Sequence, residues 1–93
     1  MIKSFKSKEA EKLFQGRFSS KLPQAIQRSA AIKLEMINAA TVFETLRVPP
    51  SNHLEELHGA RKGQYSIRIN KQWRICFTWK GSDAFDVEIV DYH

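Results

Sequence analysis

Apolar residues recur at every second position in the last third of the chain. Two such runs, Tyr65–Ile69 and Trp73–Trp79, are separated by the polar segment Asn70–Gln72, and a third run, Phe85–Tyr92, follows a turn over Lys80–Ala84. A two-residue period is typical of amphipathic β-strands, because successive side chains of a strand point to opposite faces of the sheet. The pattern therefore predicts three consecutive antiparallel strands with one apolar face and one polar face.

The loop between the first two strands determines which residues face each other. A three-residue loop, Asn70–Gln72, is the shortest ordinary choice that keeps both apolar sets on the same face. This register pairs Ile67 with Ile75 and Arg68 with Arg74. Two arginines directly opposite each other repel, which is mildly destabilising in a bare sheet.

The third strand can offset that repulsion. We expect Trp79 to pair with Phe85. Glu88 and Tyr92 are then the diagonal neighbours of Arg74, within reach of its long side chain. On one interpretation Glu88 forms a structural salt bridge. On the other the arginines bind phosphate, because the planar guanidinium fork contacts two oxygens at once.

Helical patterns occupy the first half of the chain. Ser7 can cap a short helix over Lys8–Phe14, with Gly16 as its terminator. Pro23 suits the first position of a longer helix that extends to about Ala40. The apolar side chains of this longer helix recur at helical spacing and predict one buried stripe, which consists of Ile26, Ala30, Leu34 and Ile37.

The remaining segments are short. Residues 1–6 fit a first strand, residues 42–46 fit a helical turn, and residues 53–62 fit either a strand or a loop. No repeat or interdomain linker interrupts the pattern. We therefore expect one domain over residues 1–93, of the α+β class, in which helices pack on one face of an antiparallel sheet.

The chain is basic, with 15 Lys and Arg residues against 10 Asp and Glu and a formal net charge of +5. Such a charge favours a polyanionic partner, commonly nucleic acid, although an acidic protein partner or merely a solvated surface also fits. No apolar run reaches the roughly 18 residues of a membrane span, and no apolar export segment is present, so we expect a cytoplasmic protein. The single cysteine, Cys76, fits a reducing compartment. The histidines and Cys76 lack zinc-ligand spacing, and we expect neither a metal nor a cofactor.

One stretch carries a family resemblance. The sequence LEELHGARKGQYSIRINKQWRICFTW, followed by DVEIVDYH, resembles the HigB branch of the RelE-type toxins of bacterial toxin–antitoxin systems. The resemblance extends over essentially the whole chain, from MIKSF to the terminal DYH. It implies a compact antiparallel sheet with helices on one side. It also implies an endoribonuclease that depends on the 70S ribosome and cuts mRNA in the ribosomal A site without a metal ion.

The same resemblance implies the partners. The toxin would be neutralised by a HigA-like antitoxin that carries a helix-turn-helix and is encoded beside it. Operator DNA would be bound only by the toxin–antitoxin complex, chiefly through the antitoxin, and no membrane would be involved.

The resemblance also implies catalytic residues. Arg74, within QWR, matches the family's active-site arginine, which suits the charge of the scissile phosphate. Asp91, Tyr92 and His93 match the terminal triplet that shapes the site. His58 stands where relatives often have lysine, and we include it in the catalytic group.

A second group is expected to bind RNA. Arg61, Lys62 and Arg68 supply positive charge for the phosphate backbone. Glu55 stands where some relatives carry a histidine linked to activity, and we place it with this group. Ala60 stands where relatives often have aspartate, which removes one carboxylate from the basic loop.

Metal-free cleavage uses the ribose 2′-OH as nucleophile and needs a proton acceptor, positive charge on the phosphoryl oxygens and an acid for the departing 5′-oxygen. His93 is the first candidate for proton transfer, because the ordinary pKa of histidine lies near neutral pH. Asp91 can orient a histidine or accept the proton itself. Tyr92 can stack on a base or donate to the phosphate, and His58 can act as the acid or bind phosphate.

Strand parity argues against part of this assignment. Alternation along the last strand places Asp91 and His93 on the apolar face, opposite to Arg74. A site that contains all three requires a twist or bulge at the end of the strand.

Two further functions fit the sequence. The first is a non-enzymatic basic module that binds RNA or an acidic protein through Arg61, Lys62 and Arg68. The second is a toxin-fold protein of weakened activity, because Glu55 and Ala60 depart from the family pattern.

Overall fold

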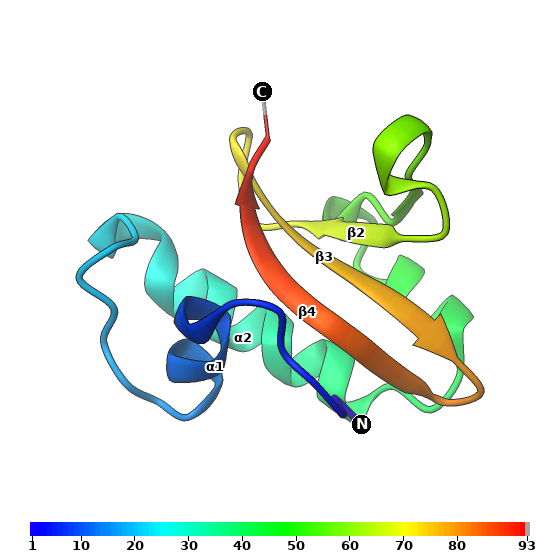
Figure 1. Cartoon of the computed structure of the whole chain (residues 1–93), viewed down its shortest axis with the longest axis horizontal. Helices are drawn as coiled ribbons and strands as arrows, with labels where there is room; N and C mark the ends of the chain where they lie inside the picture. The colour runs from blue at the N-terminus through cyan, green and yellow to red at the C-terminus, as the bar shows by residue number, and fades with distance from the viewer. Residues whose placement is uncertain (93) are drawn as a thin grey trace.

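The computed structural model describes residues 1–92, in which two α-helices accompany a four-stranded antiparallel sheet with strand order β1-β2-β3-β4 (Figure 1). Short 3₁₀ helices, labelled η, lie in the connections. The elements in chain order are α1 (Lys8–Phe14), α2 (Gln24–Ala39), η1 (Phe43–Arg47), η2 (Pro50–Asn52), β1 (Glu55–Glu56), η3 (Gly59–Arg61), β2 (Tyr65–Arg68), β3 (Trp73–Lys80) and β4 (Asp83–Asp91).

Both helices form where the sequence predicts them. The Ser7 hydroxyl oxygen accepts a hydrogen bond from the Ala10 N–H at 3.2 Å, which caps α1. Gly16 follows α1 with a φ of +78°, a left-handed conformation that favours glycine. α2 begins directly after Pro23, whose fixed φ and missing N–H suit a helix start.

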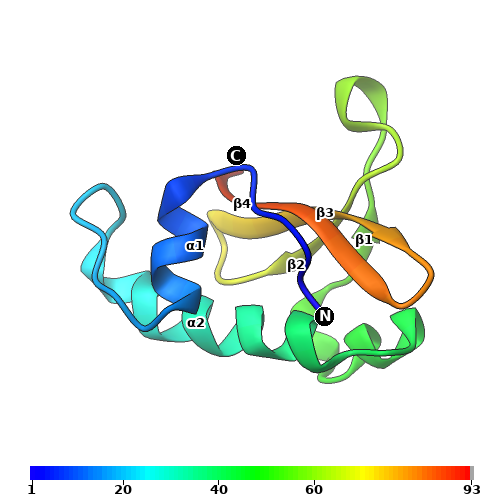
Figure 2. The ribbon, with the colours of Figure 1, turned by 60° about the horizontal axis from the view of Figure 1, so that its bottom comes forward.

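The helices cover one face of the sheet. Figure 2 shows α2 crossing beneath the strands, and α1 packs against both α2 and β4. The predicted stripe of α2 is buried, and it meets the apolar faces of β2, β3 and β4 in one core. Burial of one Leu or Ile side chain contributes about 1.5–3 kcal/mol, so this core is the main source of stability. The residues of the core that are nearly or wholly inaccessible to solvent include Leu34, Ile37, Ile67, Ile75, Phe77 and Val87.

The strand register is confirmed for most of the sheet. Ile67 pairs with Ile75 and Arg68 with Arg74, as the three-residue loop predicts. Arg74 also pairs with Val90, so the end of β4 lies where the alternation of apolar residues places it.

The expected pairing of Trp79 with Phe85 is wrong, because β4 contains a bulge. Phe85 pairs with Thr78, and Ala84 pairs with Trp79. Asp86, with a φ of +53°, lies inside the irregularity, where β4 has one more residue than β3. The extra residue reverses the faces on the turn side, so that Ala84 enters the core and Phe85 lies on the polar face.

The N-terminal segment lies along the outer edge of β4. Ile2 and Phe5 form isolated parallel bridges with Ala84 and Val87. The Lys6 N–H donates to the Val87 carbonyl at 2.9 Å. The expected first strand is thus reduced to two bridges, but it still pairs with the sheet (Figure 1).

The segment over residues 53–62 combines both expected alternatives. Glu55 and Glu56 form the two-residue strand β1, which pairs with Ser66 and Tyr65 at the opposite edge of the sheet. The chain then leaves the sheet in a loop that contains η3. This loop projects from the face opposite to α2 (Figure 2).

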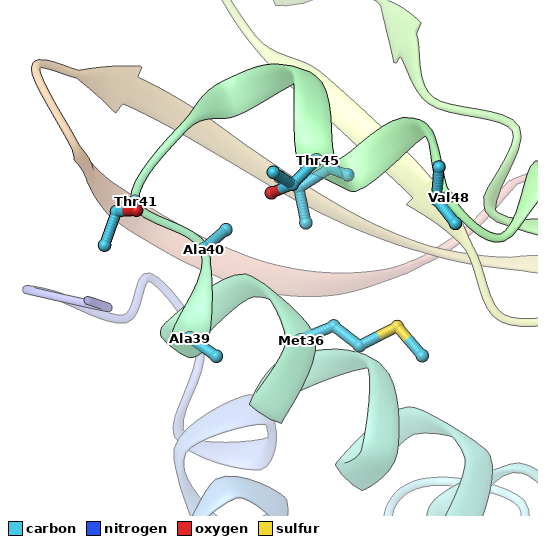
Figure 3. A pocket seen from close by; sticks show the side chains of 7 residues that line it. Met36, Ala39, Ala40, Thr41, Thr45 and Val48 are labelled. Atoms are coloured by element: carbon cyan, nitrogen blue, oxygen red, sulfur yellow. The ribbon is translucent and has the colours of Figure 1, made fainter.

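A pocket of about 380 Å³ opens between the C-terminal end of α2 and η1 (Figure 3). It is lined by Met36, Ala39, Ala40, Thr41, Thr45, Leu46 and Val48. None of these side chains can transfer a proton at neutral pH, so the pocket is not the site that the sequence predicts. No helix within residues 1–92 is long and apolar enough to cross a membrane.

Asn52 joins the helical layer to the start of β1. Its side chain is fully buried, and its Nδ2 donates to the carbonyls of Leu46 at 3.1 Å and Val48 at 3.4 Å. Its Oδ1 accepts a hydrogen bond from the Lys33 ammonium on α2. Asn52 therefore sets the path of the chain directly before His53.

We expect Asn52→Ala to lower the free energy of unfolding by about 1–3 kcal/mol, because it leaves buried carbonyl groups without a donor. Ser51→Ala, at the exposed neighbouring position, should change it by less than about 0.5 kcal/mol. Urea denaturation of both variants measures the difference. Equal stability of the two variants would contradict the role given to Asn52.

Candidate functional site

The candidate site lies on the polar face of the sheet and is centred on Arg74 of β3. Only 8% of Arg74 is exposed, so its charged group lies mostly inside the protein. Its Nε donates to the Ser66 hydroxyl at 2.7 Å, and its Nη2 donates to the His53 carbonyl at 2.6 Å. These bonds fix the plane of the guanidinium group, because they hold it from two directions.

One nitrogen of this guanidinium group has no acceptor among the described residues. Within residues 1–92, no protein group accepts a hydrogen bond from the Arg74 Nη1. No side-chain nitrogen or oxygen in that part of the chain is both buried and unbonded. The Arg74 Nη1 is therefore not fully enclosed by these residues, and it keeps hydrogen-bond capacity for an anion.

Two further side chains flank Arg74. The Glu55 Oε1 lies 3.8 Å from the Arg74 Nη2, and this carboxylate is about half exposed. The Arg74 Cζ lies 5.9 Å from the centre of the Tyr92 ring, within the range of a cation–π contact. The predicted proximity of Tyr92 to Arg74 is thus confirmed. Glu55, which we grouped with the RNA-binding residues, lies beside the central arginine.

Glu88 does not form an ion pair with Arg68 or Arg74, so the interpretation in which it offsets their repulsion is wrong. The Glu88 Oε2 instead lies 3.2 Å from the Arg61 Nη1 and 3.6 Å from the Lys6 Nζ. The physical reason is that the Arg74 side chain turns toward β2 and β1, where its acceptors lie. The η3 loop brings Arg61 over the sheet to Glu88 instead.

Arg68 faces Arg74 in the register but is held apart from it. Its Nε donates to the Asn70 carbonyl at 3.1 Å, so its side chain follows the turn between β2 and β3. This contact lowers the repulsion that direct opposition would produce. Arg68 therefore lies at the border of the site.

His58 and Lys62 lie in the η3 loop and are exposed. The His58 carbonyl accepts a hydrogen bond from the Arg61 N–H at 3.3 Å. The loop that carries both residues projects from the polar side of the sheet (Figure 2). Arg61, in the same loop, contacts the sheet through Glu88 of β4.

The terminal triplet is only partly placed at the site. Asp91 pairs with Trp73 on the face opposite to Arg74, as the strand parity predicts, and its Oδ2 accepts a hydrogen bond from the Gln72 Nε2 at 3.1 Å. Tyr92 lies near Arg74, and its N–H donates to the Gln72 carbonyl at 2.6 Å. His93 lies outside the described residues.

Cys76 is buried on the same polar face, between Ser66 and Glu88 on the neighbouring strands. Burial raises the pKa of the Cys76 thiol above its ordinary value of 9.0, although nearby Arg61 acts in the opposite direction. The thiol is therefore neutral at physiological pH. Among residues 1–92, no three His, Cys, Asp or Glu side chains gather as metal ligands.

Sequence reasoning missed two contributors to the site. The His53 carbonyl binds Arg74, and a backbone acceptor leaves no trace in residue types. Lys6 reaches Glu88 because the N-terminal segment pairs with β4. The available signal was the alternation of Phe5 and Lys6, which was too short to indicate a face.

Comparison with known proteins gives the family. The model of the family described as "RelE-like toxin of type II toxin-antitoxin system HigB" matches residues 3–93. The chain is 40% identical to Toxin HigB-1 of Vibrio cholerae over 80 residues, which are 85% of this chain and 84% of that protein. It is 34% identical to Endoribonuclease HigB of Proteus vulgaris over 93 residues, the full length of both.

Solved structures show the same fold at lower identity. YafQ from E. coli superposes with a TM-score of 0.61 at 15% identity, with 98% of this chain and 91% of that chain covered. The YoeB–YefM complex from Staphylococcus aureus gives a TM-score of 0.52 at 18% identity, with 100% and 98% covered. The architecture of helices on one face of an antiparallel sheet is therefore that of RelE-like toxins. The chain belongs to the HigB-like family of RelE-like toxins from type II toxin–antitoxin systems.

Proposed function

We propose that this HigB-like toxin is a ribosome-dependent endoribonuclease that cuts mRNA in the ribosomal A site without a metal ion. The observation that carries the proposal is the geometry of Arg74, a largely buried arginine whose guanidinium plane is fixed by two hydrogen bonds and whose Nη1 has no acceptor within residues 1–92. The name of the Proteus vulgaris relative, Endoribonuclease HigB, supports the same reaction class.

The chemistry that Arg74 can perform is stabilisation of charge on a phosphoryl group. The ribose 2′-oxygen attacks the phosphorus, the bond to the 5′-oxygen breaks, and negative charge gathers on the oxygens that do not react. A donor fixed in advance stabilises this charge more than a mobile one, because no reorganisation is needed during the reaction. The bonds of Arg74 to Ser66 and His53 supply that preorganisation.

Proton transfer needs two further groups. We retain His93 as the first candidate, with Asp91, His58 and Tyr92 in the supporting roles that the family resemblance implies. The structure adds Glu55, because its carboxylate lies 3.8 Å from the Arg74 Nη2, beside the position of a phosphate bound to this arginine. A carboxylate there can accept the 2′-proton, but it also weakens anion binding through its negative charge.

The small number of candidate catalytic groups at the site supports the proposal of ribosome dependence. Correct orientation of the nucleophile can supply about 7–11 kcal/mol of the barrier, and a bound ribosome can hold the mRNA in that orientation. The polar face is not covered by α2, and the η3 loop projects beside it (Figure 2), so we place a strand presented by the ribosome on this face.

We further propose a HigA-like helix-turn-helix antitoxin as the partner of this toxin, operator DNA as a ligand of the complex only, and a cytoplasmic location. Membership of a toxin–antitoxin family supports the antitoxin. The fold relative from Staphylococcus aureus was solved as a complex of YoeB with YefM.

Substitution of Arg74 tests the proposed reaction. We expect Arg74→Lys to lower the rate of mRNA cleavage on programmed ribosomes by about 10²–10³-fold, because lysine keeps the charge but loses the planar fork. Mapping of mRNA ends in a purified translation mixture measures this rate. Arg28→Lys, on the exposed surface of α2, is the matched control and should cleave as the wild type does.

Thermal denaturation and antitoxin binding show whether the Arg74→Lys variant is folded. A folded variant with full activity would overturn the assignment of Arg74. A wild-type protein that binds its antitoxin but leaves every mRNA intact would overturn the nuclease proposal and favour a toxin of weakened activity.

A second comparison separates the candidates for proton transfer. We expect His93→Gln to lower the cleavage rate by about 10²-fold or more, as removal of a general acid or base does. Glu55→Gln should lower it by less than about tenfold, because His93 is the first candidate for proton transfer and Ser66 and His53 already hold Arg74. Glu56→Gln, the adjacent exposed position of β1, should have no effect. The reverse order of the two losses would assign the proton acceptor to Glu55.

A further inference from the structure

A second pair of cations lies on the polar face, at the β4 side of the site. Phe5 bridges to Val87 and packs against the core, so the next side chain, Lys6, points to the opposite face. There the Lys6 Nζ lies 3.6 Å from the Glu88 Oε2. The Arg61 Nη1, from the η3 loop, lies 3.2 Å from the same oxygen.

Glu88 holds two cations that come from distant parts of the chain. Its side chain is only 16% exposed, whereas that of Lys6 is 57% exposed and that of Arg61 is 32% exposed. The carboxylate thus lies beneath the cations, and both cationic groups remain accessible from solvent. The Arg61 Nη1 also donates to the Gln64 Oε1 at 3.0 Å, which fixes its position.

The charge balance of this cluster is positive. Two cations surround one carboxylate, and Cys76, which faces Glu88 across the strands, contributes no charge because its thiol is neutral. A single carboxylate between two cations leaves one positive charge for an external anion. The exposed Lys6 ammonium can rotate toward such an anion without losing its place on the face.

The cluster is also close to Arg74. Cys76 pairs with Glu88 and Arg74 pairs with Val90, so Glu88 and Arg74 are diagonal neighbours on one face of the β3–β4 ladder. Such neighbours are about 7–8 Å apart. One RNA strand can therefore contact Arg74 and the cluster at the same time.

We propose that Lys6 and Arg61, positioned by Glu88, form a second anion-binding position that takes an RNA backbone phosphate next to the one at Arg74. Lys6 is the new member of the site. The proposal rests on the proposed function, since it assumes that RNA crosses this face. It extends the site from the β1–β2 side of the sheet to the N-terminal segment.

Binding to programmed ribosomes tests the proposal without any need for cleavage. The probe is a 70S ribosome that holds an mRNA with 2′-O-methyl groups in the A-site codon, which removes the nucleophile. We expect Lys6→Gln to weaken binding about two- to fivefold, the effect of one exposed ion pair. The slope of log Kd against log salt should fall by about 0.7–1, because one phosphate contact is lost.

Two further variants separate RNA contact from a structural role of Lys6. Lys21→Gln removes the same charge from an exposed position in the loop between α1 and α2 and should keep the wild-type slope. Lys6→Arg keeps the charge and should restore binding. A purely structural Lys6–Glu88 pair would change the melting temperature in Lys6→Gln and leave the salt slope unchanged.

The failures of the two proposals differ. If wild-type protein cleaves mRNA on ribosomes but Lys6→Gln has the affinity and salt slope of Lys21→Gln, the second anion position is wrong. If wild-type protein cleaves no mRNA, the proposed function fails first. Vacant ribosomes identify the source of the phosphate. If Lys6→Gln also binds more weakly to vacant ribosomes, the phosphate belongs to ribosomal RNA. If it binds more weakly only to programmed ribosomes, the phosphate belongs to mRNA.

Discussion

The arrangement of the polar face is set by one buried guanidinium group, which needs hydrogen-bond partners. A charged group that leaves water is costly unless its N–H groups find acceptors, and Arg74 finds them in the Ser66 hydroxyl and the His53 carbonyl. The second of these requires the chain to pass close to β2 just before β1, and the buried side chain of Asn52 holds it there. The position of this connection and the orientation of Arg74 therefore depend on each other. If the connection moved, the buried guanidinium group would lose one of its acceptors.

The site divides into two halves with different physical characters. On the β1–β2 side, Arg74 is largely buried and held by two hydrogen bonds, which suits stabilisation of charge during a reaction. On the β4 side, Lys6 and Arg61 are more exposed and share one carboxylate, which suits reversible contact with a backbone. Arg74 has its acceptors on β2 and in the residues directly before β1, whereas Lys6 and Arg61 come from the N-terminal segment and a loop.

Much of this arrangement could be predicted from the sequence, because it follows from local rules. The period of two and an odd loop are enough to place Arg68 opposite Arg74, and this pairing is confirmed. The position of Phe85 could not be predicted in this way, because the bulge at Asp86 changes the parity without any change in the alternation of apolar residues. The position of Lys6 could not be predicted either, because its partner, Glu88, is far away in the sequence. Prediction succeeded where an unbroken alternation sets the pairing of consecutive strands, and it failed where a bulge interrupts the ladder and where distant segments meet.

The pairing of the N-terminal segment with β4 has a consequence for folding during synthesis. Ile2 and Phe5 find their partners, Ala84 and Val87, only in β4, which follows every other element of the fold in the chain. Contacts between such distant positions form late, because the intervening chain must first lose its freedom. A nascent chain that still lacks β4 has neither the Glu88 carboxylate that binds Lys6 nor the strand with which the N-terminal segment pairs. The proposed RNA-binding face is therefore assembled only after β4 has been synthesised and has joined the sheet.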